Sequence, residues 1–523
     1  MDRDALALLL INDYAAASEK AAEAQLWKQC HYARISGFRA EIAAAKKDRN
    51  SQALLASTSL FRAFLDDALL FYSQLTLQLA SVHGLKRVLS IVRPHLRPFE
   101  IGVSFNTTPV SSTTTSHKPQ VFMTCFQCLI YLGDLARYRD STTNPSPLPK
   151  HYYLLAHKLL PSSGNPFNQL AVLPLTPGPS VDLIPSELYV RALCCKKPFV
   201  TAKKNLEVCL GKPRPVVEGI DGVLEACRLL LLNLGSSTQE WSNEDFDSRI
   251  KVPLLSSFAL IFATRTYDIE TLARIARLLI GVSEIISVSS SRRKCLESLL
   301  TSLLLISTNA ALHRLAQIKK LGVTALGYSK PMDSIQDVVE FARILVLHFA
   351  KFSKEHDRFF ALNENGEAAA EKKEEEEGEE KIVSFWEEIA KFCSAVQEVG
   401  GLDEESGFNH DWWTTKSSTV LEDELVGFTA VDGNEYVVNG QGAFDDSNEM
   451  NVDIDDEDDE NDEEVGGNLK MDTKIAQLLQ SFLQISRDTN VPLSFNGSGW
   501  RCGVEGMDEN VSNSHAGDLQ RRS

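Results

Sequence analysis

Apolar residues recur three and four positions apart along most of this chain. The first series runs from near Ser18 to Ile42, and the second runs from Leu54 to Leu79. Apolar positions at this spacing form one face of an α-helix. Each series is long enough for a helix of roughly 25 residues, about twice the usual length in globular proteins. The pattern therefore predicts two long consecutive helices near the N-terminus.

Shorter amphipathic segments follow a linker rich in threonine and serine at residues 107–117. Pro161 and Pro198 are 37 residues apart, and Ala156 and Ala192 are 36 residues apart. This spacing is close to that of tetratricopeptide units, which are helix pairs of about 34 residues. The segments predict an all-α fold in which helix pairs stack into a solenoid. The expected helices cover residues 121–139, 149–160, 165–173, 186–195, 198–210, 216–234, 252–264, 271–287, 293–316, 334–354, 383–399 and 471–486.

The net charge of −18 is concentrated in two acidic runs. Residues 364–381 contain nine acidic and three basic residues, and residues 445–464 contain thirteen acidic residues and no basic one. Such runs are typical of solvated, disordered linkers. The rest of the chain is nearly neutral. This balance disfavours a globally basic nucleic-acid-binding protein, because affinity for phosphates needs clustered lysine and arginine.

The ten cysteines are scattered among apolar residues, too sparsely for a disulfide scaffold in a chain of 523 residues. We expect reduced core thiols, and hence a cytosolic or nuclear protein. Cys125 and Cys128 form a Cys-x-x-Cys pair, but no second pair has zinc spacing, so we expect no metal site and no cofactor. The N-terminus lacks the basic region of a signal peptide, and no apolar stretch reaches the roughly 18 residues of a transmembrane helix.

The segment Leu132–Arg139 holds the residues most suited to ligand chemistry. Asp134 and Tyr138 are four residues apart and share a face of the predicted helix, with Arg137 beside them. An arginine held by a carboxylate and flanked by a phenol hydroxyl suits phosphate recognition, because the guanidinium offers paired donors. A surface salt bridge on a repeat helix is the alternative interpretation.

Several separate anchor segments of this region are recognisable, over roughly 85 residues. They are Tyr131–Arg139, Tyr152-Tyr153, Leu160–Ala171, Tyr189–Leu193 and Pro198-Phe199. Together they resemble the SMG and Est adaptor family, which acts in nonsense-mediated mRNA decay and, in some lineages, in telomerase recruitment. The resemblance implies a 14-3-3-like module followed by a helical-hairpin domain. The segments Ser384–Trp386 and Leu421–Phe428 extend it weakly.

The resemblance also implies roles for individual residues at a phosphopeptide site. Arg137 would bind the phosphate, Tyr138 would donate its hydroxyl, and Asp134 would hold the arginine. Asn168 would hydrogen-bond the backbone of the peptide. The family usually has a lysine near Tyr32 or Ala33, so Arg34 is the nearest candidate for the second cation.

The expected domains follow from these patterns and from the resemblance. They are a 14-3-3-like, tetratricopeptide-like phosphopeptide-binding module (1–212), a helical-hairpin domain (213–362), an acidic linker (363–381), a C-terminal part of the helical domain resembling an Est-like DNA/RNA-binding region (382–440), an acidic disordered run (441–466), a helix (467–489) and a disordered tail (490–523).

The implied function is that of a non-catalytic adaptor that binds the phosphorylated up-frameshift RNA helicase at Ser-Gln or Thr-Gln sites. It would recruit decay or phosphatase factors or other SMG-type adaptors, in cytoplasmic mRNA decay granules with shuttling to the nucleus. The PIN nuclease of some relatives is not expected, since 57 residues follow Gly466. The alternatives are a telomerase-associated protein that contacts nucleic acid and a helical scaffold whose phosphate site has decayed.

Overall fold

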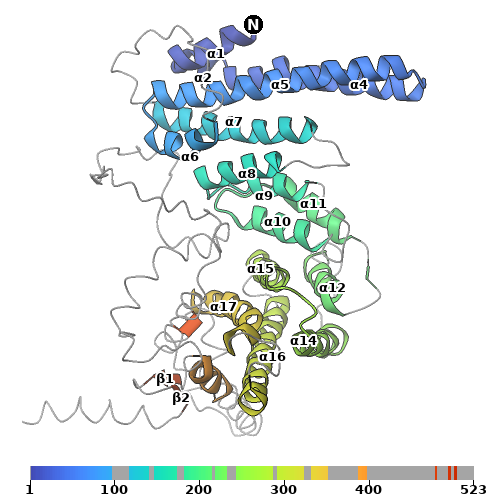
Figure 1. Cartoon of the computed structure of the whole chain (residues 1–523), viewed down its shortest axis with the longest axis vertical. Helices are drawn as coiled ribbons and strands as arrows, with labels where there is room; N and C mark the ends of the chain where they lie inside the picture. The colour runs from blue at the N-terminus through green and yellow to red at the C-terminus, as the bar shows by residue number, and fades with distance from the viewer. Residues whose placement is uncertain are drawn as a thin grey trace, which may run out of the picture. The chain divides into compact units, whose positions relative to one another are not determined.

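The helices of the computed structural model divide into two units by their contacts. The described residues are 2–96, 117–139, 147–173, 182–211, 213–214, 218–232, 243–286, 291–322, 331–351, 387–396, 478–479, 493–495 and 500–502. The first unit takes its described residues from 2–173 and 195–202, and the second from 182–194 and from residue 203 onward. Helices make up nearly all of the described residues, so the predicted all-α class is confirmed (Figure 1).

The first predicted long helix is broken near its start. The chain forms α1 (Arg3–Asn12), α2 (Tyr14–Glu19) and α3 (Ala22–Gln25), and Ala21 between the last two adopts a left-handed φ of 47°. A residue in this conformation cannot continue a right-handed helix. The predicted long helix therefore begins at Ala22 and not near Ser18, because apolar spacing does not report a single reversed backbone angle. From Ala22 the helical backbone continues without interruption to Lys47, which is close to the predicted length.

A π-helical segment, η1 (Leu26–Tyr32), continues the chain from α3. The Trp27 ring stacks on Tyr131 with their centroids 4.0 Å apart. His31 is fully buried, and its Nδ1 atom lies 3.0 Å from the Leu26 carbonyl oxygen and 3.1 Å from the Tyr72 hydroxyl. Burial lowers the pKa of His31 to about 4, so this ring is a neutral core residue at neutral pH.

Helices α4 (Ala33–Lys47) and α5 (Ser51–Val82) form a long hairpin. Asn50 caps α5, because its side chain accepts a hydrogen bond of 3.0 Å from the Ala53 amide. The C-terminal half of α5 is buried against α7 (Lys118–Arg139), whereas the N-terminal half and α4 extend past the end of α7 (Figure 1). The hairpin therefore leaves a long exposed arm beside the C-terminal end of α7.

Helices α6 (Lys86–Leu96), α8 (Leu148–Leu159) and α9 (Asn165–Ala171) complete the first unit. Helix α8 packs on α7, α6 contacts α5 and α8, and α9 contacts α8. Cys125 and Cys128 lie in the buried part of α7, and burial raises the pKa of both thiols. The prediction of core cysteines is confirmed here, and all cysteines characterised in the described part of the chain are free thiols.

A short backbone bridge ties two loops of the first unit together, 34 residues apart in sequence. The Lys197 amide donates to the Ser162 carbonyl at 2.9 Å, and the Gly164 amide donates to the Lys197 carbonyl at 3.0 Å. This separation matches the length of a tetratricopeptide unit. The bridge therefore lies where the predicted repeat brings successive loops together.

The second unit packs around α15 (Ile269–Ile285), which contacts α10 (Leu183–Cys194), α12 (Gly219–Leu232), α16 (Ser291–Leu321) and α17 (Gln336–Lys351). The remaining helical elements of this unit are α11 (Thr201–Leu210) from residue 203 onward, α13 (Asn243–Phe246), the π segment η4 (Asp247–Lys251), α14 (Val252–Thr264), the 3-10 turn η6 (Pro331–Ser334) and residues 387–396. The contacts of α10 with α15 place α10 in the second unit. The predicted domain boundary at residue 212 stays a prediction.

Arginine–carboxylate pairs are buried within the second unit. Arg293 pairs with Glu297 at 2.9 Å and Arg314 with Asp337 at 2.7 Å. Residues Arg292–Leu321 of α16 have the length and hydropathy of a membrane-spanning helix, and 56% of the most apolar window is buried inside the structure. Together with its contacts to α14 and α17, this burial makes α16 a core helix of the unit.

The described C-terminal residues include one two-stranded sheet. Strands β1 (Leu493–Phe495) and β2 (Trp500–Cys502) pair antiparallel. The predicted disordered tail was therefore wrong for these six residues, in which apolar and polar side chains alternate around an Asn-Gly-Ser-Gly turn sequence. The predicted acidic runs, the segment Leu421–Phe428 and most of the predicted helix 471–486 lie outside the described residues.

Candidate phosphate-binding site

Arg137, Asp134 and Tyr153 form a closed hydrogen-bonded cluster on α7 and α8. The Arg137 Nη2 group donates to Asp134 Oδ1 at 2.8 Å, and its Nε group donates to the Tyr153 hydroxyl at 3.3 Å. The Tyr153 hydroxyl in turn donates to the same carboxylate oxygen at 2.8 Å. The arginine is therefore fixed by two partners rather than by one flexible ion pair.

The environment of the cluster keeps Arg137 charged. Burial by itself would lower the pKa of Arg137, but Tyr153 and Asp134 outweigh it and hold this pKa raised. The pKa of Tyr153 is raised, first by burial and then by the negative charge of Asp134. Arg137 is therefore a permanent cation and Tyr153 a neutral hydroxyl at any physiological pH.

The Tyr138 ring contacts two guanidinium groups, that of Arg137 and that of Arg39. The Cζ atom of Arg39 on α4 lies 4.2 Å from the centroid of the Tyr138 ring, and the Cζ atom of Arg137 lies 4.8 Å from it. Two such contacts place the guanidinium carbons within about 9 Å of each other. One phosphate group can bridge cations at such a separation, since each N–H···O bond extends over about 2.8 Å.

The cation of α4 that contacts Tyr138 is Arg39 and not Arg34, the residue that the sequence suggested. Arg34 stacks on Phe64 of α5, with its Cζ atom 4.6 Å from that ring, and does not join the cluster. Asn168 lies on α9, where it is 5% exposed, and among the described residues no hydrogen bond links it to Arg137, Asp134 or Tyr153. The structure thus brings together Asp134, Arg137 and Tyr138 and leaves the other two predicted residues apart.

The π segment explains why Arg39, and not Arg34, reaches α7. Trp27 stacks on Tyr131 of α7. In a regular α-helix the residue seven positions after Trp27, which is Arg34, would lie on the same face of the helix as Trp27. A π turn adds about one residue to the register and rotates the following helix by roughly 100°. In a regular helix Arg39 would lie about 140° around the axis from Arg34 and would point away from α7. The rotation by the π turn brings Arg39 to within about 40° of the direction that Arg34 would otherwise have.

The cluster has an excess of positive charge and unused donors. Of the five N–H groups of a guanidinium, two of those on Arg137 are engaged, so three lack a partner among the described residues. The side chain of Arg137 is 26% exposed, so these donors are within reach of a ligand. Arg39 is exposed and makes no ion pair within the described part of the chain. The arrangement can hold a dianion such as a phosphate.

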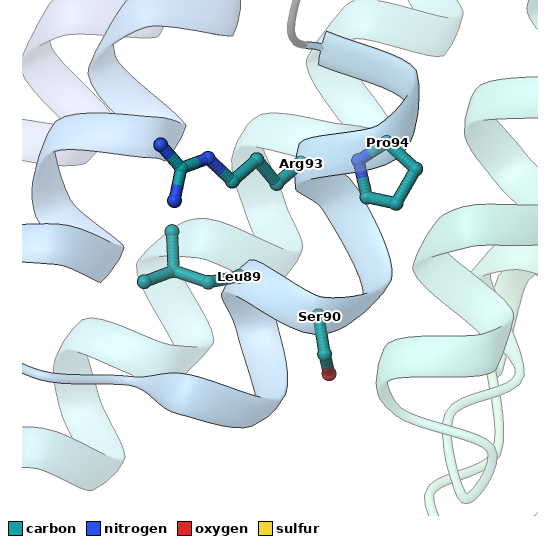
Figure 2. A pocket seen from close by; sticks show the side chains of 4 residues that line it. All are labelled: Leu89, Ser90, Arg93 and Pro94. Atoms are coloured by element: carbon teal, nitrogen blue, oxygen red, sulfur yellow. The ribbon is translucent and has the colours of Figure 1, made fainter. Parts of the chain in front are cut away.

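Other candidate sites are weaker. A shallow pocket beside α6 is lined by Leu89, Ser90, Arg93 and Pro94, and Figure 2 shows Leu89 and Arg93 projecting to one side while Ser90 projects away. All four residues come from a single helix, and one of them carries a charge. The described residues contain no cluster of three or more His, Cys, Asp or Glu side chains that could hold a metal ion.

Gly133 lets Tyr153 approach α7. A Cβ atom at this position would lie 2.2 Å from the Tyr153 ring, which is fully buried. We expect Gly133→Ala to lower the free energy of unfolding by about 1–3 kcal/mol through overpacking, although alanine is the better helix former. Phosphopeptide affinity should fall as well, because the displaced ring supports Arg137. Thermal unfolding and peptide titration measure the two effects.

Gly37 on α4 is the matched control, since a Cβ there meets no atom within 4 Å. Gly37→Ala is expected to stabilise the protein by about 0.5–1 kcal/mol through helix propensity. Equal melting temperatures for the two variants would contradict the packing role of Gly133.

Comparison with known proteins shows which family models this chain matches. The family models "Telomerase activating protein Est1" and "Est1 DNA/RNA binding domain" match residues 21–142 and 149–424, the second covering just over half of the chain. The chain is 32% identical over 207 residues to the nonsense-mediated mRNA decay factor SMG7 of Danio rerio, and 31% identical over 235 residues to SMG7 of Arabidopsis thaliana.

These matches cover 39% and 41% of this chain but 16% and 21% of the two relatives, so the chain spans a small part of their length. A crystal structure of Est1 and Cdc13 is similar with a TM-score of 0.48 and 13% identity, over 96% of this chain and 94% of that one. The first family model contains the whole of α7, and with it Asp134, Arg137 and Tyr138. The chain belongs to the SMG and Est adaptor family.

Proposed function

We propose that this protein is a non-catalytic adaptor in nonsense-mediated mRNA decay that binds a phosphorylated protein through Arg137, Tyr138 and Arg39. The observation that carries the proposal is the fixed guanidinium of Arg137, held by Asp134 and Tyr153 with three N–H groups left over. The similarity to SMG7 supports the pathway. The proposed ligand is the up-frameshift RNA helicase phosphorylated at Ser-Gln or Thr-Gln sites.

In this proposal the bound adaptor recruits decay or phosphatase factors, or other SMG-type adaptors, in cytoplasmic mRNA decay granules. Arg39 argues against the alternative of a decayed phosphate site. Tyr32 and Ala33 stand where the family usually has lysine, but Arg39, nearly two helical turns further along the chain, brings a second cation to Tyr138. In this proposal the guanidinium groups of Arg137 and Arg39 share one phosphate.

The test is fluorescence anisotropy of a labelled Ser-Gln peptide, phosphorylated and unphosphorylated, titrated with the full chain. We expect binding in the micromolar range for the phosphopeptide and none for its twin. Affinity should fall as the pH drops below about 6, because the phosphate then takes up its second proton and loses charge. Equal affinity for the phosphorylated and unphosphorylated peptides, or no binding of either, would contradict the proposed function.

A telomerase-associated function is the second candidate, because one matching family model is described as a DNA/RNA-binding domain and covers residues 149–424. Titration of single-stranded RNA and DNA at several salt concentrations separates the two candidates. Nucleic-acid binding would show a steep linear fall of log affinity with log salt. Phosphopeptide binding that unlabelled RNA does not displace would favour the decay adaptor.

A further inference from the structure

The α4–α5 hairpin is a basic element in an acidic protein. Between Ala33 and Arg62 it carries six basic and two acidic residues, whereas the whole chain has a net charge of −18. The hairpin also carries Arg39, which contacts Tyr138 at the candidate site. A local excess of one charge next to a binding site attracts ligands of the opposite charge. The basic residues are Arg34, Arg39, Lys46, Lys47, Arg49 and Arg62, and the acidic ones are Glu41 and Asp48.

The two flanks of α4 differ in charge. Arg39 and Lys46 are seven residues apart, which is two helical turns, so both lie on the flank of α4 that faces the Tyr138 side. Glu41 lies on the opposite flank, where its carboxylate accepts a hydrogen bond of 3.4 Å from the Ser57 hydroxyl. The flank of Arg39 and Lys46 therefore contains cations without an acidic neighbour on the same helix.

No acid of the described structure neutralises this flank. Lys46 and Lys47 are exposed and, like Arg39, make no ion pair with any described residue. The carboxylates nearest in sequence on α5 are already paired, Asp66 with Arg139 and Asp67 with Arg3. In the proposed binding mode Arg137 and Arg39 hold the phosphate. Lys46, which lies beyond Arg39 on the same flank, is then placed to contact peptide residues on one side of the phosphorylated residue.

The spacing of these cations sets the register of the ligand. Seven residues of α-helix separate Arg39 and Lys46 by about 10 Å along the axis. An extended peptide covers this distance in about three residues, at roughly 3.3–3.6 Å each. Lys47 and Arg49, which follow toward the tip of the hairpin, extend the reach by one or two further peptide residues.

We propose that the Lys46 flank of the hairpin selects acidic phosphopeptides, with Asp or Glu three to five positions from the phosphorylated residue. The inference rests on the proposed function, because the phosphate at Arg137 and Arg39 anchors the peptide. Each added pair is solvent-exposed, so the acidic residues together raise affinity about three- to tenfold at low salt. The gain disappears at about 1 M salt, where the Debye length is about 3 Å.

The experiment uses the full chain and three labelled Ser-Gln phosphopeptides that are otherwise identical. One has Asp at positions +3 to +5 from the phosphoserine, one has Asp at −5 to −3, and one has Ser at all of these positions. Titrations are made with the unmodified chain and with Lys46→Glu and Arg34→Glu. Arg34→Glu is the matched control, since it reverses a charge on the same helix but on the far side from Tyr138.

We expect one of the two acidic phosphopeptides to bind about three- to tenfold more tightly than the neutral one. Lys46→Glu should abolish that advantage and leave the neutral phosphopeptide within about twofold, and Arg34→Glu should change neither. Binding of the neutral phosphopeptide without any acidic advantage overturns this inference and leaves the proposed function standing. Absence of binding for all three phosphopeptides overturns both.

A single-stranded oligoribonucleotide provides the remaining comparison. Lysines on an exposed helix can also contact a nucleic-acid backbone. If the oligoribonucleotide binds in the micromolar range, loses affinity in Lys46→Glu and displaces the acidic phosphopeptide, the flank is a nucleic-acid surface and the peptide inference is wrong. Phosphopeptide binding that is insensitive to the oligoribonucleotide supports it.

Discussion

Arg137→Glu is expected to abolish phosphopeptide binding, with a loss of at least about 100-fold in affinity. The change removes charge-assisted hydrogen bonds worth about 1.5–3 kcal/mol each and places a carboxylate next to the phosphate. Each 1.4 kcal/mol corresponds to a factor of about ten in the dissociation constant. The new carboxylate would also lie near Asp134, so the remaining negative charge repels the ligand further. Anisotropy titration with the phosphorylated Ser-Gln peptide measures the loss.

Two further variants separate the charge of Arg137 from its shape and from general electrostatics. Arg137→Lys keeps the charge but loses the planar pair of donors, and we expect about a tenfold loss. Arg139→Glu reverses a charge two residues away on the same helix, where the arginine is 44% exposed and pairs with Asp66. We expect less than about a threefold effect there. Equal losses for Arg137→Glu and Arg139→Glu would mean that peptide binding follows overall charge, not the built site.

The second large effect is expected at Glu187→Gln, which should lower the free energy of unfolding of the second unit by about 3–5 kcal/mol. The Glu187 carboxylate is fully buried and accepts from three arginines at 3.4 Å (Arg191), 3.0 Å (Arg274) and 3.3 Å (Arg277). This cluster joins α10 to α15. Without the carboxylate charge, the guanidinium groups remain partly buried and repel one another.

The pH dependence of stability provides a second measurement at Glu187. Burial by itself would raise the pKa of Glu187, but the charges of Arg191, Arg277 and Arg274 outweigh it, so the pKa is lowered. A carboxyl with a lowered pKa in the folded state contributes stability above its unfolded pKa of about 4.3 and loses it as the pH falls through the folded value. Stability measured down to about pH 3 should therefore fall more steeply for the unmodified chain than for Glu187→Gln.

Glu270→Gln is the matched control for this cluster. Glu270 contacts Arg274 and Arg277 at 2.8 and 3.1 Å, but its side chain is 61% exposed. Water compensates an exposed carboxylate, so the change should cost less than about 1 kcal/mol. Thermal unfolding followed by circular dichroism compares the variants, and similar melting temperatures for Glu187→Gln and Glu270→Gln would contradict the role of burial.

The helical pattern predicted most of the elements near their true limits. The segment predicted at 121–139 is α7, and those at 149–160 and 252–264 are α8 and α14. Apolar spacing reports the face that a helix buries, so it is reliable where a helix is regular. Between Ser18 and Ile42 it predicted a long helix but missed two local features, the reversed backbone angle of Ala21 and the wider turn of η1. The angle of Ala21 leaves the hydrophobic pattern unchanged, and one π turn shifts that pattern by only about one residue.

Several decisive contacts had no signal in the pattern of the chain. Tyr153 lies within an anchor of the family resemblance, but its hydrogen bonds to Arg137 and Asp134 depend on α8 packing against α7 at Gly133. Nothing in the residues around Glu187 indicates that its side chain is buried. Its burial results from contact with arginines 87 and 90 positions away. Contacts at such separations are properties of packing and not of local spacing.

The sequence by itself determined that Asp134, Arg137 and Tyr138 share one end of one helix, because spacings of three and four residues are local and a regular helix places them together. Only the tertiary structure decided which cation joins them. The choice between Arg34 and Arg39 depends on the rotation of α4 about its axis. That rotation is set by the π turn and by the stacking of Trp27 on Tyr131, more than one hundred residues away.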